Sequence, residues 1–499
     1  MDRILTAETQ KRMTLRKQEL DSFLERLFQT HALPGMAVCI RGPGGATYEK
    51  YLGKRSLSKN QPVTPDTIFG IASLSKSFVG CALSLLEAEG RVRLSEPVSR
   101  YLPHFRVPGL PQDMVEIHHL LTHTSGLPPM QPLEWSIAMN SRGDDSEWAR
   151  AMREQAPNKM ETIDEVLSYI AAGDYGRPAY TTLGFPGEYM SYSNEGYAIL
   201  SYVVDRVADM PLEDFLQERI FKPLGMSRTV LDLDGSEARA IAGGDITSLF
   251  EQDGDHLAED DYFSVLPPFR GAACMKSTAR DLTRYYKMLG DGGLFEGEQI
   301  IPRKAVDIMV GKAFPLQQAY TYCYGLKKRL FCGRTIGEHT GGLHGTSCSG
   351  GFIEGPDLGF MRSQGSFSIT VLTNVGNADT EPFRSACYNF ILGLPLDTDH
   401  MEFVPAGRPF AEPEQLTGDF VSQEGLPQHA RVRVEDGHLT IRYQGEEVLA
   451  EYCGGNRFLC RTAKEPHKRV ELMRFFVHRG RAQAVQCGSR VYQRTEENQ

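Results

Sequence analysis

The tetrapeptide Ser-Leu-Ser-Lys occurs twice in this chain, at residues 56–59 and at residues 73–76. A serine hydroxyl becomes an effective nucleophile when a neighbouring base takes its proton, and a lysine amine can be that base. Two residues three positions apart share one face of a helix, which would bring the amine beside the hydroxyl. Chance alone yields such a spacing roughly once or twice in a chain of average composition and this length, so the surroundings of each copy must distinguish them.

The surroundings favour the second copy. The first is followed at once by the turn-forming residues 60–62, which predict a loop. Ser73 and Lys76 stand at the start of an apolar stretch, FGIASLSKSFVGCALSLLEAEG, which predicts a helix. A helix N-terminus favours the negative charge that develops during acyl transfer. Lysine serves as a base where burial or a nearby cation lowers its pKa; a solvated helix lysine is the alternative interpretation of Lys76.

Two further short elements follow in the chain, Tyr-Ser-Asn at 192–194 and His-Thr-Gly at 339–341. The order and spacing of the three elements resemble the serine β-lactamase and penicillin-binding-protein superfamily. The resemblance is strongest to its class C branch, which includes class C β-lactamases, D-aminopeptidases and DD-peptidases. The segments HLLTHTSGLP (119–128), FKPLGMSRT (221–229) and KSTARDLTRYYKML (276–289) are also typical of that family. The resemblance covers roughly residues 20–395.

The resemblance implies a role for each matching side chain. Ser73 resembles the acylated nucleophile, and Lys76 resembles its proton acceptor. Tyr192 resembles the phenol that passes protons to the leaving group and activates water for deacylation. Asn194 resembles the side chain that binds the substrate amide.

The resemblance also places an oxyanion hole at the backbone N–H groups of Ser73 and Gly342. The glycines at 341 and 342 would let a substrate lie close to that strand. Each element also has a purely structural interpretation, since a Tyr-x-Asn is usually a turn or cap.

His339 departs from the family pattern, because many relatives carry a lysine there. That lysine is a fixed positive charge suited to a substrate carboxylate, whereas an imidazole is mostly neutral near pH 7. The sequence therefore predicts a substrate without a free carboxylate beside the scissile bond. His339 is also a candidate for the proton relay through a hydrogen bond to Ser73 or Tyr192, and His344 is a weaker candidate for the same task.

No metal or organic cofactor is expected. His119 and His123 are four residues apart and could share a helix face, as metal ligands do. No glutamate follows His119, so the pattern is not H-E-x-x-H. The segment 123–128 predicts a structural turn, and His118 is expected at the surface.

The elements that would position these residues suggest an α+β fold. Periodicity predicts a helix over 77–89 that ends before Gly90, and further helices over 8–30, 194–209, 211–221 and 381–393. Strands are predicted within 36–53 and 350–374. By resemblance, residues 1–394 form a β-lactamase/transpeptidase-like domain, an antiparallel sheet flanked by helices. Residues 129–185 read as an insertion or lid, whose Trp135 and Trp148 would line the cleft or pack in the core.

The composition changes after this domain. Residues 395–415 hold four prolines and predict a linker. From 416 to 499 the apolar residues alternate around the hairpin signal Asp436-Gly437, which predicts a small antiparallel β-barrel. A barrel behind such a domain resembles the lipocalin-like domain of some class C-type peptidases and of penicillin-binding-type peptide cyclases.

Composition excludes several function classes. The net charge of −10 argues against nucleic acid as the main partner, because binding phosphates requires a basic face. No run of about 18 apolar residues predicts a membrane-spanning helix. The N-terminal segment lacks the apolar core of a signal peptide, so a cytoplasmic location is expected. The ten cysteines form no CxxC pair and are expected to be free thiols.

These observations together predict a serine hydrolase that acts through an acyl-enzyme on a small-molecule or short-peptide substrate. The predicted substrates are small peptides or aminoacyl amides with D-residues, as for a D-aminopeptidase. Two alternatives stay open. The same acyl-enzyme could pass to an alcohol or amine, as in an esterase, transesterase or peptide cyclase, or the chain could be a catalytically inactive binding homologue. Whether it forms a homo-oligomer also stays open.

Overall fold

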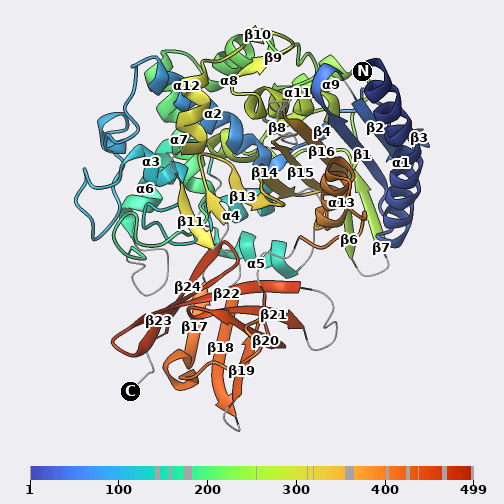
Figure 1. Cartoon of the computed structure of the whole chain (residues 1–499). Helices are drawn as coiled ribbons and strands as arrows, with labels where there is room; N and C mark the ends of the chain where they lie inside the picture. The colour runs from blue at the N-terminus through green and yellow to red at the C-terminus, as the bar shows by residue number, and fades with distance from the viewer. Residues whose placement is uncertain are drawn as a thin grey trace. The chain divides into compact units, whose positions relative to one another are not determined.

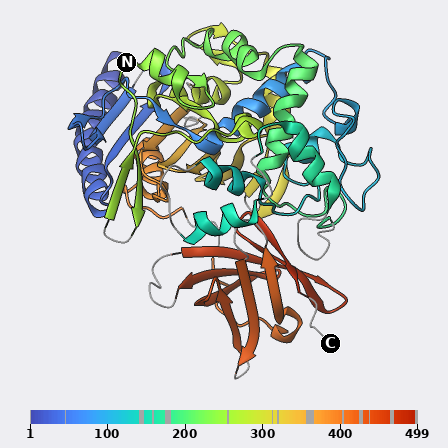
Figure 2. The same ribbon diagram turned by 180° about the vertical axis from the view of Figure 1, so that it is seen from behind.

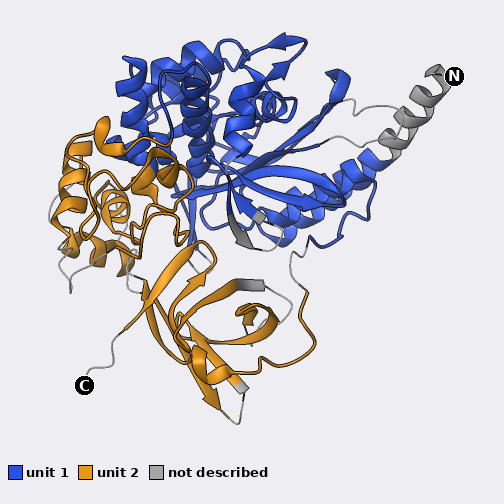
Figure 3. Ribbon diagram, turned by 60° about the vertical axis from the view of Figure 1, so that its left-hand side comes forward, with its two compact units in different colours: residues 1–94, 197–400 blue, residues 95–196, 401–499 orange. Residues whose placement is uncertain are grey.

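A computed structural model describes residues 2–45, 47–140, 147–156, 160–173, 182–253, 256–311, 313–317, 320–354, 365–400, 404–422, 428–435, 438–462 and 469–495. Contacts group the chain into two compact units (Figure 3). The first contains residues 1–94 and 197–400, and the second contains residues 95–196 and 401–499. Among the described residues, no helix combines the length and apolar character needed to cross a membrane.

The first unit is built on a nine-stranded sheet (Figure 1). Its strand order is β11-β12-β13-β14-β15-β16-β1-β2-β3, and every neighbouring pair runs antiparallel. The strands span Phe314–Gln317, Tyr320–Tyr322, Lys327–Phe331, Arg334–Leu343, Thr346–Ile353, Phe367–Thr373, Gly35–Arg41, Thr47–Ser56 and Gln61–Pro62 in that order.

Helices cover this sheet. Helices α1 (Asp2–Thr30) and α13 (Glu381–Leu392) pack against each other and against strands of the sheet (Figures 1 and 2). Their apolar residues, such as Leu24 and Phe383, join Val38 and Val371 of the sheet in one buried cluster. Helix α11 (Ala279–Gly290) packs on β1, β15 and β16. The predicted antiparallel sheet flanked by helices is therefore confirmed.

Helix α2 (Ser75–Ala88) lies inside this unit, and every residue from Ser75 to Leu86 is buried. It packs against α12 (Arg303–Gly311), α10 (Arg270–Ala273) and α8 (Leu212–Leu216). Gly90 follows the helix with a φ of 77°, a left-handed conformation that favours glycine. The predicted helix and its terminating glycine are both present.

The remaining elements of the first unit are short. Its other helix is α9 (Ser236–Ala242), and α7 (Asn194–Ala208) begins in the second unit and continues into the first. Strands β4 (Phe69–Gly70), β8 (Met275–Ser277) and β5 (Val230–Leu231) form a small sheet. Strands β6 (Leu249–Asp253) and β7 (His256–Asp260) form one hairpin, and β9 (Leu294–Phe295) and β10 (Glu298–Gln299) form another.

The second unit combines two distant segments of the chain. Residues 95–196 contribute α3 (Ile117–Leu121), α4 (Pro132–Asn140), α5 (Glu147–Gln155) and α6 (Ile163–Ala172). The C-terminal segment forms a closed barrel of eight strands in consecutive order. These are β17 (Gly418–Ser422), β18 (Gln428–Glu435), β19 (His438–Tyr443), β20 (Glu446–Gly454), β21 (Arg457–Thr462), β22 (Arg469–His478), β23 (Arg481–Cys487) and β24 (Arg490–Arg494).

The closed antiparallel barrel confirms the fold predicted for residues 416–499. Inward-facing residues such as Phe420, Val432 and Phe475 fill its interior, as the alternating pattern requires. The hairpin signal Asp436-Gly437 lies outside the described residues, as do parts of the insertion predicted at 129–185 and of the hairpin predicted at 350–374.

The predicted linker begins with residues that pack in the first unit. Leu396 is buried, and the His400 ring stacks on Phe331 at 3.7 Å between centroids. His400 Nε2 donates to Asn389 Oδ1 at 2.9 Å, while Arg329 donates to its Nδ1 at 3.1 Å. The domain boundaries drawn from the sequence remain predictions. All ten cysteines lie among the described residues, and each is a free thiol.

Candidate active site

Ser73 lies in a tight turn immediately before helix α2. The turn is the 3-10 segment Ala72–Leu74, and α2 continues from Ser75. Ala72 has a φ of 42°, a conformation that residues with a side chain rarely adopt. Such strain persists where the surrounding structure enforces it, and it is common at functional sites. This strained turn places Ser73, which is only partly buried, at the start of α2.

Lys76 is fully buried beneath Ser73. Its exposed fraction is 0%. Its amine donates a hydrogen bond to Ser73 Oγ at 3.1 Å and another to the Ala272 carbonyl at 2.9 Å. The ring of Tyr197 lies 5.8 Å from the amine. The three-residue spacing therefore brings an amine within hydrogen-bond reach of a hydroxyl, the arrangement that activation of a serine requires.

The first Ser-Leu-Ser-Lys copy has a different environment. Ser56 ends strand β2, and its hydroxyl donates to the carboxylate of Glu259 at 2.7 Å. Lys59 is exposed. Two identical tetrapeptides thus differ in burial and in partners, and only the second pairs its serine with a buried amine.

Strand β14 runs directly past the Ser73 turn. A Cβ atom added at Gly341 would lie 3.0 Å from the backbone nitrogen of Ser73 and 2.8 Å from the carbonyl oxygen of Ile71. The Cys348 thiol, opposite Gly341 on β15, donates to that same Ile71 oxygen. At Gly342 an added Cβ would meet nothing within 4 Å. Glycine is therefore required at 341 for this close approach, and space is open beside 342.

His339 is buried in the same strand, and its imidazole ring is in the neutral form. Its Nδ1–H donates to the Thr340 carbonyl at 2.5 Å, and its Nε2 accepts from the Tyr322 hydroxyl at 3.0 Å. Burial, followed by the positive charges of Lys327 and Lys76, lowers the pKa of His339 to about 3. The imidazole is therefore uncharged at neutral pH. Tyr322 and Thr340 are thus two hydrogen-bond partners of His339, and the hydrogen bond to Ser73 or Tyr192 suggested by the sequence stays a prediction.

His344 points to a different set of partners. Its Nδ1 lies 3.2 Å from Glu251 Oε1, and its Nε2 lies 2.8 Å from Asp260 Oδ2. These hydrogen bonds and charges outweigh burial and raise the pKa of His344 to about 10. The imidazole is a cation that ties the β14–β15 turn to the β6–β7 hairpin. Both ring nitrogens of His344 thus face carboxylates, whereas the sequence suggested a hydrogen bond to Ser73 or Tyr192.

Tyr192 and Asn194 lie in the second unit. Tyr192 is 9% exposed, and Asn194 is half-buried at the first position of α7. Between them, the Ser193 hydroxyl accepts from the Gly196 backbone N–H at 3.1 Å, which satisfies one amide at the start of the helix. The Tyr-Ser-Asn element is therefore the N-terminal boundary of α7.

His123 also contacts this element, a role that the sequence did not suggest. Its ring lies 4.2 Å from the Tyr192 ring between centroids. Its Nδ1 accepts from the Ser193 backbone N–H at 3.1 Å, and its carbonyl accepts from the Ser191 N–H at 2.9 Å. Its φ is 58°, in the left-handed region. Helix α3 has ended at Leu121, so His119 and His123 do not share a helix face, which their spacing in the sequence would have allowed.

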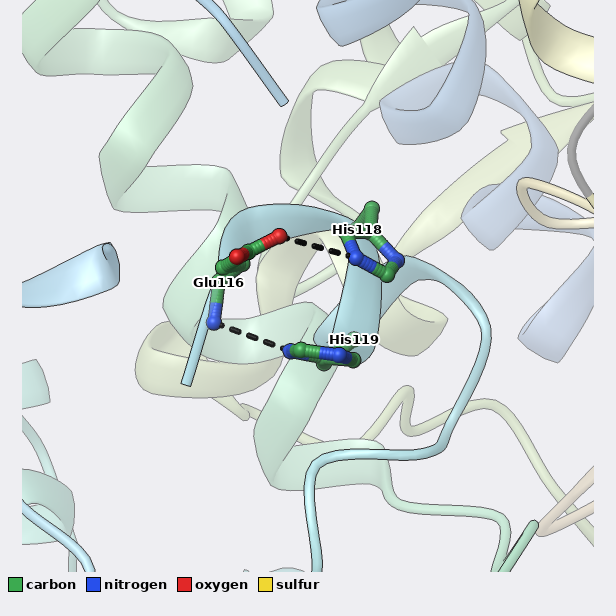
Figure 4. Close-up of side chains that lie close together, drawn as sticks. All are labelled: Glu116, His118 and His119. Atoms are coloured by element: carbon green, nitrogen blue, oxygen red, sulfur yellow. Dashed lines mark hydrogen bonds and ion pairs between the residues drawn. The ribbon is translucent and has the colours of Figure 1, made fainter. Parts of the chain in front are cut away.

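Glu116, His118 and His119 are the one group among the described residues whose side chains could jointly hold a metal ion (Figure 4). Their contacts have another explanation. The Glu116 backbone N–H donates to His119 Nδ1 at 3.1 Å, and His118 Nε2 lies 2.9 Å from the Glu116 carboxylate. These bonds close the N-terminus of α3, which accounts for the cluster without a cation.

The two tryptophans of the predicted insertion differ in burial. Trp135 is buried and packs edge-on against Tyr169 at 5.3 Å between ring centroids. Trp148 is half-buried. Core packing is therefore the observed role of Trp135.

Comparison with known proteins identifies the family of the chain. The model of the Beta-lactamase family matches residues 20–374 of the chain. The chain belongs to the β-lactamase family. Penicillin-binding protein 4* of Bacillus subtilis is 27% identical over 342 residues, which cover 66% of this chain and 68% of that protein.

Two solved structures show the same fold at lower identity. A crystal structure of SurE is 20% identical, with a TM-score of 0.68, and the match covers 97% of this chain and all of that one. D-amino acid amidase of Ochrobactrum anthropi SV3 is 23% identical, with a TM-score of 0.53, over 75% of this chain and 93% of that one. Homologues in this family are serine hydrolases, and the chain shares their β-lactamase/penicillin-binding-protein-like fold.

Proposed function

We propose that the chain is a serine hydrolase that forms an acyl-enzyme with small peptide or aminoacyl amide substrates, D-residues among them. The observation that carries the proposal is the hydrogen bond of 3.1 Å between the fully buried Lys76 amine and Ser73 Oγ. Ser73 Oγ attacks the substrate carbonyl carbon while its proton passes to Lys76. The C–N bond then breaks, and the leaving amine takes a proton. Water attacks the resulting ester, which releases the acid and returns the proton to Ser73.

The other residues of the proposed site assist these steps. The backbone N–H groups of Ser73 and Gly342 would bind the developing oxyanion. The close approach at Gly341 supports this, since it brings β14 against the Ser73 backbone. Tyr192 would move protons to the leaving amine and from the attacking water, and Asn194 would bind the substrate amide.

The neutral state of His339 supports the proposed substrate class. With its pKa lowered to about 3, the imidazole supplies no positive charge for a carboxylate beside the scissile bond. Amide substrates without that carboxylate do not need a positive charge at this position for binding. The D-amino acid amidase among the structural neighbours makes D-aminoacyl amides the first substrates to test.

Labelling with a serine-directed phosphonate tests the nucleophile. Mass spectrometry of the intact protein and of its peptides should show one adduct, on Ser73. The adduct should be absent in Ser73→Ala and retained in Ser56→Ala, the matched variant of the first tetrapeptide. We expect Ser73→Ala to lower amidase activity by at least about 10³-fold. An adduct that persists in Ser73→Ala, or that lies on Ser56, would refute the assignment.

A substrate panel tests the substrate class. It compares D- and L-aminoacyl anilides with acyl-D-Ala-D-Ala, short esters and a chromogenic cephalosporin. We expect the aminoacyl anilides to be turned over fastest. Rapid turnover of the cephalosporin or of acyl-D-Ala-D-Ala would contradict the argument from His339, whereas a gain of these substrates by His339→Lys would support it.

A further inference from the structure

The barrel contacts the Tyr192 element through the hairpin of β23 and β24. The Tyr192 backbone N–H donates to the Ser489 carbonyl at 2.8 Å, and the Val491 N–H donates to Ser191 Oγ at 3.3 Å. These two bonds cross between segments of the second unit that are about 300 residues apart in the chain. The hairpin turn is thus held to the backbone of the element that carries the proposed proton-transfer tyrosine.

Side chains extend this contact. Tyr189 packs edge-on against Phe476 of β22, with ring centroids 4.7 Å apart at an angle of 90°. Met190 is fully buried, and its sulfur lies 4.0 Å from the amide nitrogen of Gln486. Successive residues from 189 to 192 therefore each have a partner on the barrel.

Arg490 places a positive charge against the Tyr192 ring. Its guanidinium carbon lies 4.6 Å from the ring centroid, within the range of a cation–π interaction. Arg490 is half-buried, and its Nη1 also donates to Ser489 Oγ at 3.2 Å, which anchors the side chain on the turn. Negative charge on a phenolate spreads into its ring, so a cation on the ring attracts the phenolate more strongly than the phenol.

Two other ionisable groups of this unit contact the Tyr192–Asn194 element. The His123 ring contacts that of Tyr192 at 4.2 Å, and Glu195 accepts from the Ser193 hydroxyl at 3.2 Å. A carboxylate near a phenol opposes its ionisation, whereas a cation against the ring favours it.

We propose that Arg490 is a positioning residue that stabilises the phenolate form of Tyr192, so that the barrel takes part in proton transfer at the active site. The part of this inference that concerns catalysis rests on the function proposed above. Its physical content, a cation that favours ionisation of one particular tyrosine, can be measured without any substrate.

The experiment is an NMR titration of full-length protein labelled with ¹³Cζ-tyrosine. The spectrum of Tyr192→Phe identifies the Tyr192 signal among the 20 tyrosines. In Arg490→Gln we expect the midpoint of this signal to rise by about one pH unit or more relative to the parent protein. Arg490→Lys keeps the charge and should retain most of the effect. If the glutamine variant melts at a lower temperature, the neutral Arg490→Met is the second test variant, and the same rise is expected for it.

Arg474→Gln is the matched control. Arg474 lies on β22 of the same barrel, with its guanidinium 5.1 Å from the ring of Phe476, which has no ionisable group. This variant should leave the Tyr192 midpoint unchanged. An unchanged midpoint in Arg490→Gln, or an equal rise in Arg474→Gln, would overturn the inference.

The pH dependence of kcat/KM adds a second measurement. If Tyr192 acts in proton transfer, Arg490→Gln should lower kcat/KM at neutral pH by roughly tenfold. At higher pH the kcat/KM of the variant should return to that of the parent protein, and KM should change little throughout. A uniform loss at every pH would indicate a purely structural contact and refute the proposal, as would a rise in KM alone. Failure of phosphonate labelling at Ser73 would refute the proposed function instead, and the NMR titration would still decide the role of Arg490.

Discussion

The ion pairs of His344 make stability depend on pH in a specific direction. His344 lies between Glu251 and Asp260, at 3.2 and 2.8 Å, and these partners raise its pKa from 6.5 to about 10. A group whose pKa is higher in the folded protein stabilises that state fully below the unfolded value, here pH 6.5, and loses this effect as the pH rises through about 10. We therefore predict that His344→Gln is most destabilising in mildly acidic and neutral solution.

The magnitude follows from the shift and from exposure. A shift of this size corresponds to about 4–5 kcal/mol at 1.36 kcal/mol per unit. The carboxylates of Glu251 and Asp260 are 34% and 42% exposed, so solvent screens much of this energy. We expect His344→Gln to lower the free energy of unfolding by about 1–2 kcal/mol near pH 7.

Urea unfolding of the parent and of the variant, at several pH values between 6 and 10, measures this difference. The control is His256→Gln, an exposed histidine on β7 of the same hairpin, which should change little. The difference between parent and His344→Gln should shrink as the pH approaches 10. A difference that is constant over this range, or that grows with pH, would refute the argument.

Three further predictions concern the first unit. Gly341→Ala should reduce phosphonate labelling of Ser73 strongly and Gly342→Ala much less, because only the first added Cβ meets the Ser73 turn; labelling rates of the two variants measure this. Glu338→Gln should destabilise the protein by about 3–5 kcal/mol at pH 7, because it leaves the buried Arg329 and Arg384 without a counter-charge. Burial raises the pKa of Glu338, but those cations outweigh it and lower the pKa to about 2, so the stabilisation is present above pH 4.5 and is lost as the pH falls towards 2. The difference between the urea midpoints of the parent and of Glu338→Gln should therefore be smaller at pH 3 than at pH 7. If kcat/KM changes with pH between pH 5 and 8, the same change should be seen in His339→Gln, because the pKa of His339 is lowered to about 3 and this side chain does not titrate in that range. Loss of the pH dependence in the variant would contradict the structure.

Features that depend on neighbours in the chain could be predicted from the sequence. Ser73 and Lys76 are three residues apart, so helical geometry alone brings them together. The alternation of apolar residues after 416 predicts which side chains face the interior of the barrel. Gly90 predicts the end of helix α2. These properties are local, so the helix and the barrel could be predicted from the pattern, whereas the fold of the larger domain was predicted from the family resemblance.

Features that depend on distant residues could not be predicted. The contact of Arg490 with Tyr192 and the pairing of His344 with Glu251 and Asp260 join segments that no local pattern relates. His123 was missed for a different reason. Its left-handed φ follows the end of α3 and turns the ring towards Tyr192, and a backbone conformation of this kind has no reliable signal at a histidine.

The division of the second unit between two segments has a consequence for biosynthesis. Ser489 follows Tyr192 by 297 residues, yet its carbonyl accepts the Tyr192 N–H. At about 5–20 residues per second, a ribosome needs roughly 15–60 s to make the intervening chain. During that interval the Tyr192 element exists without its hairpin partner, while the nascent Ser73 and Lys76 pair has already been translated. Assembly of the proposed proton path therefore waits for the barrel, so the nascent polypeptide carries its nucleophile well before the Arg490 contact can form.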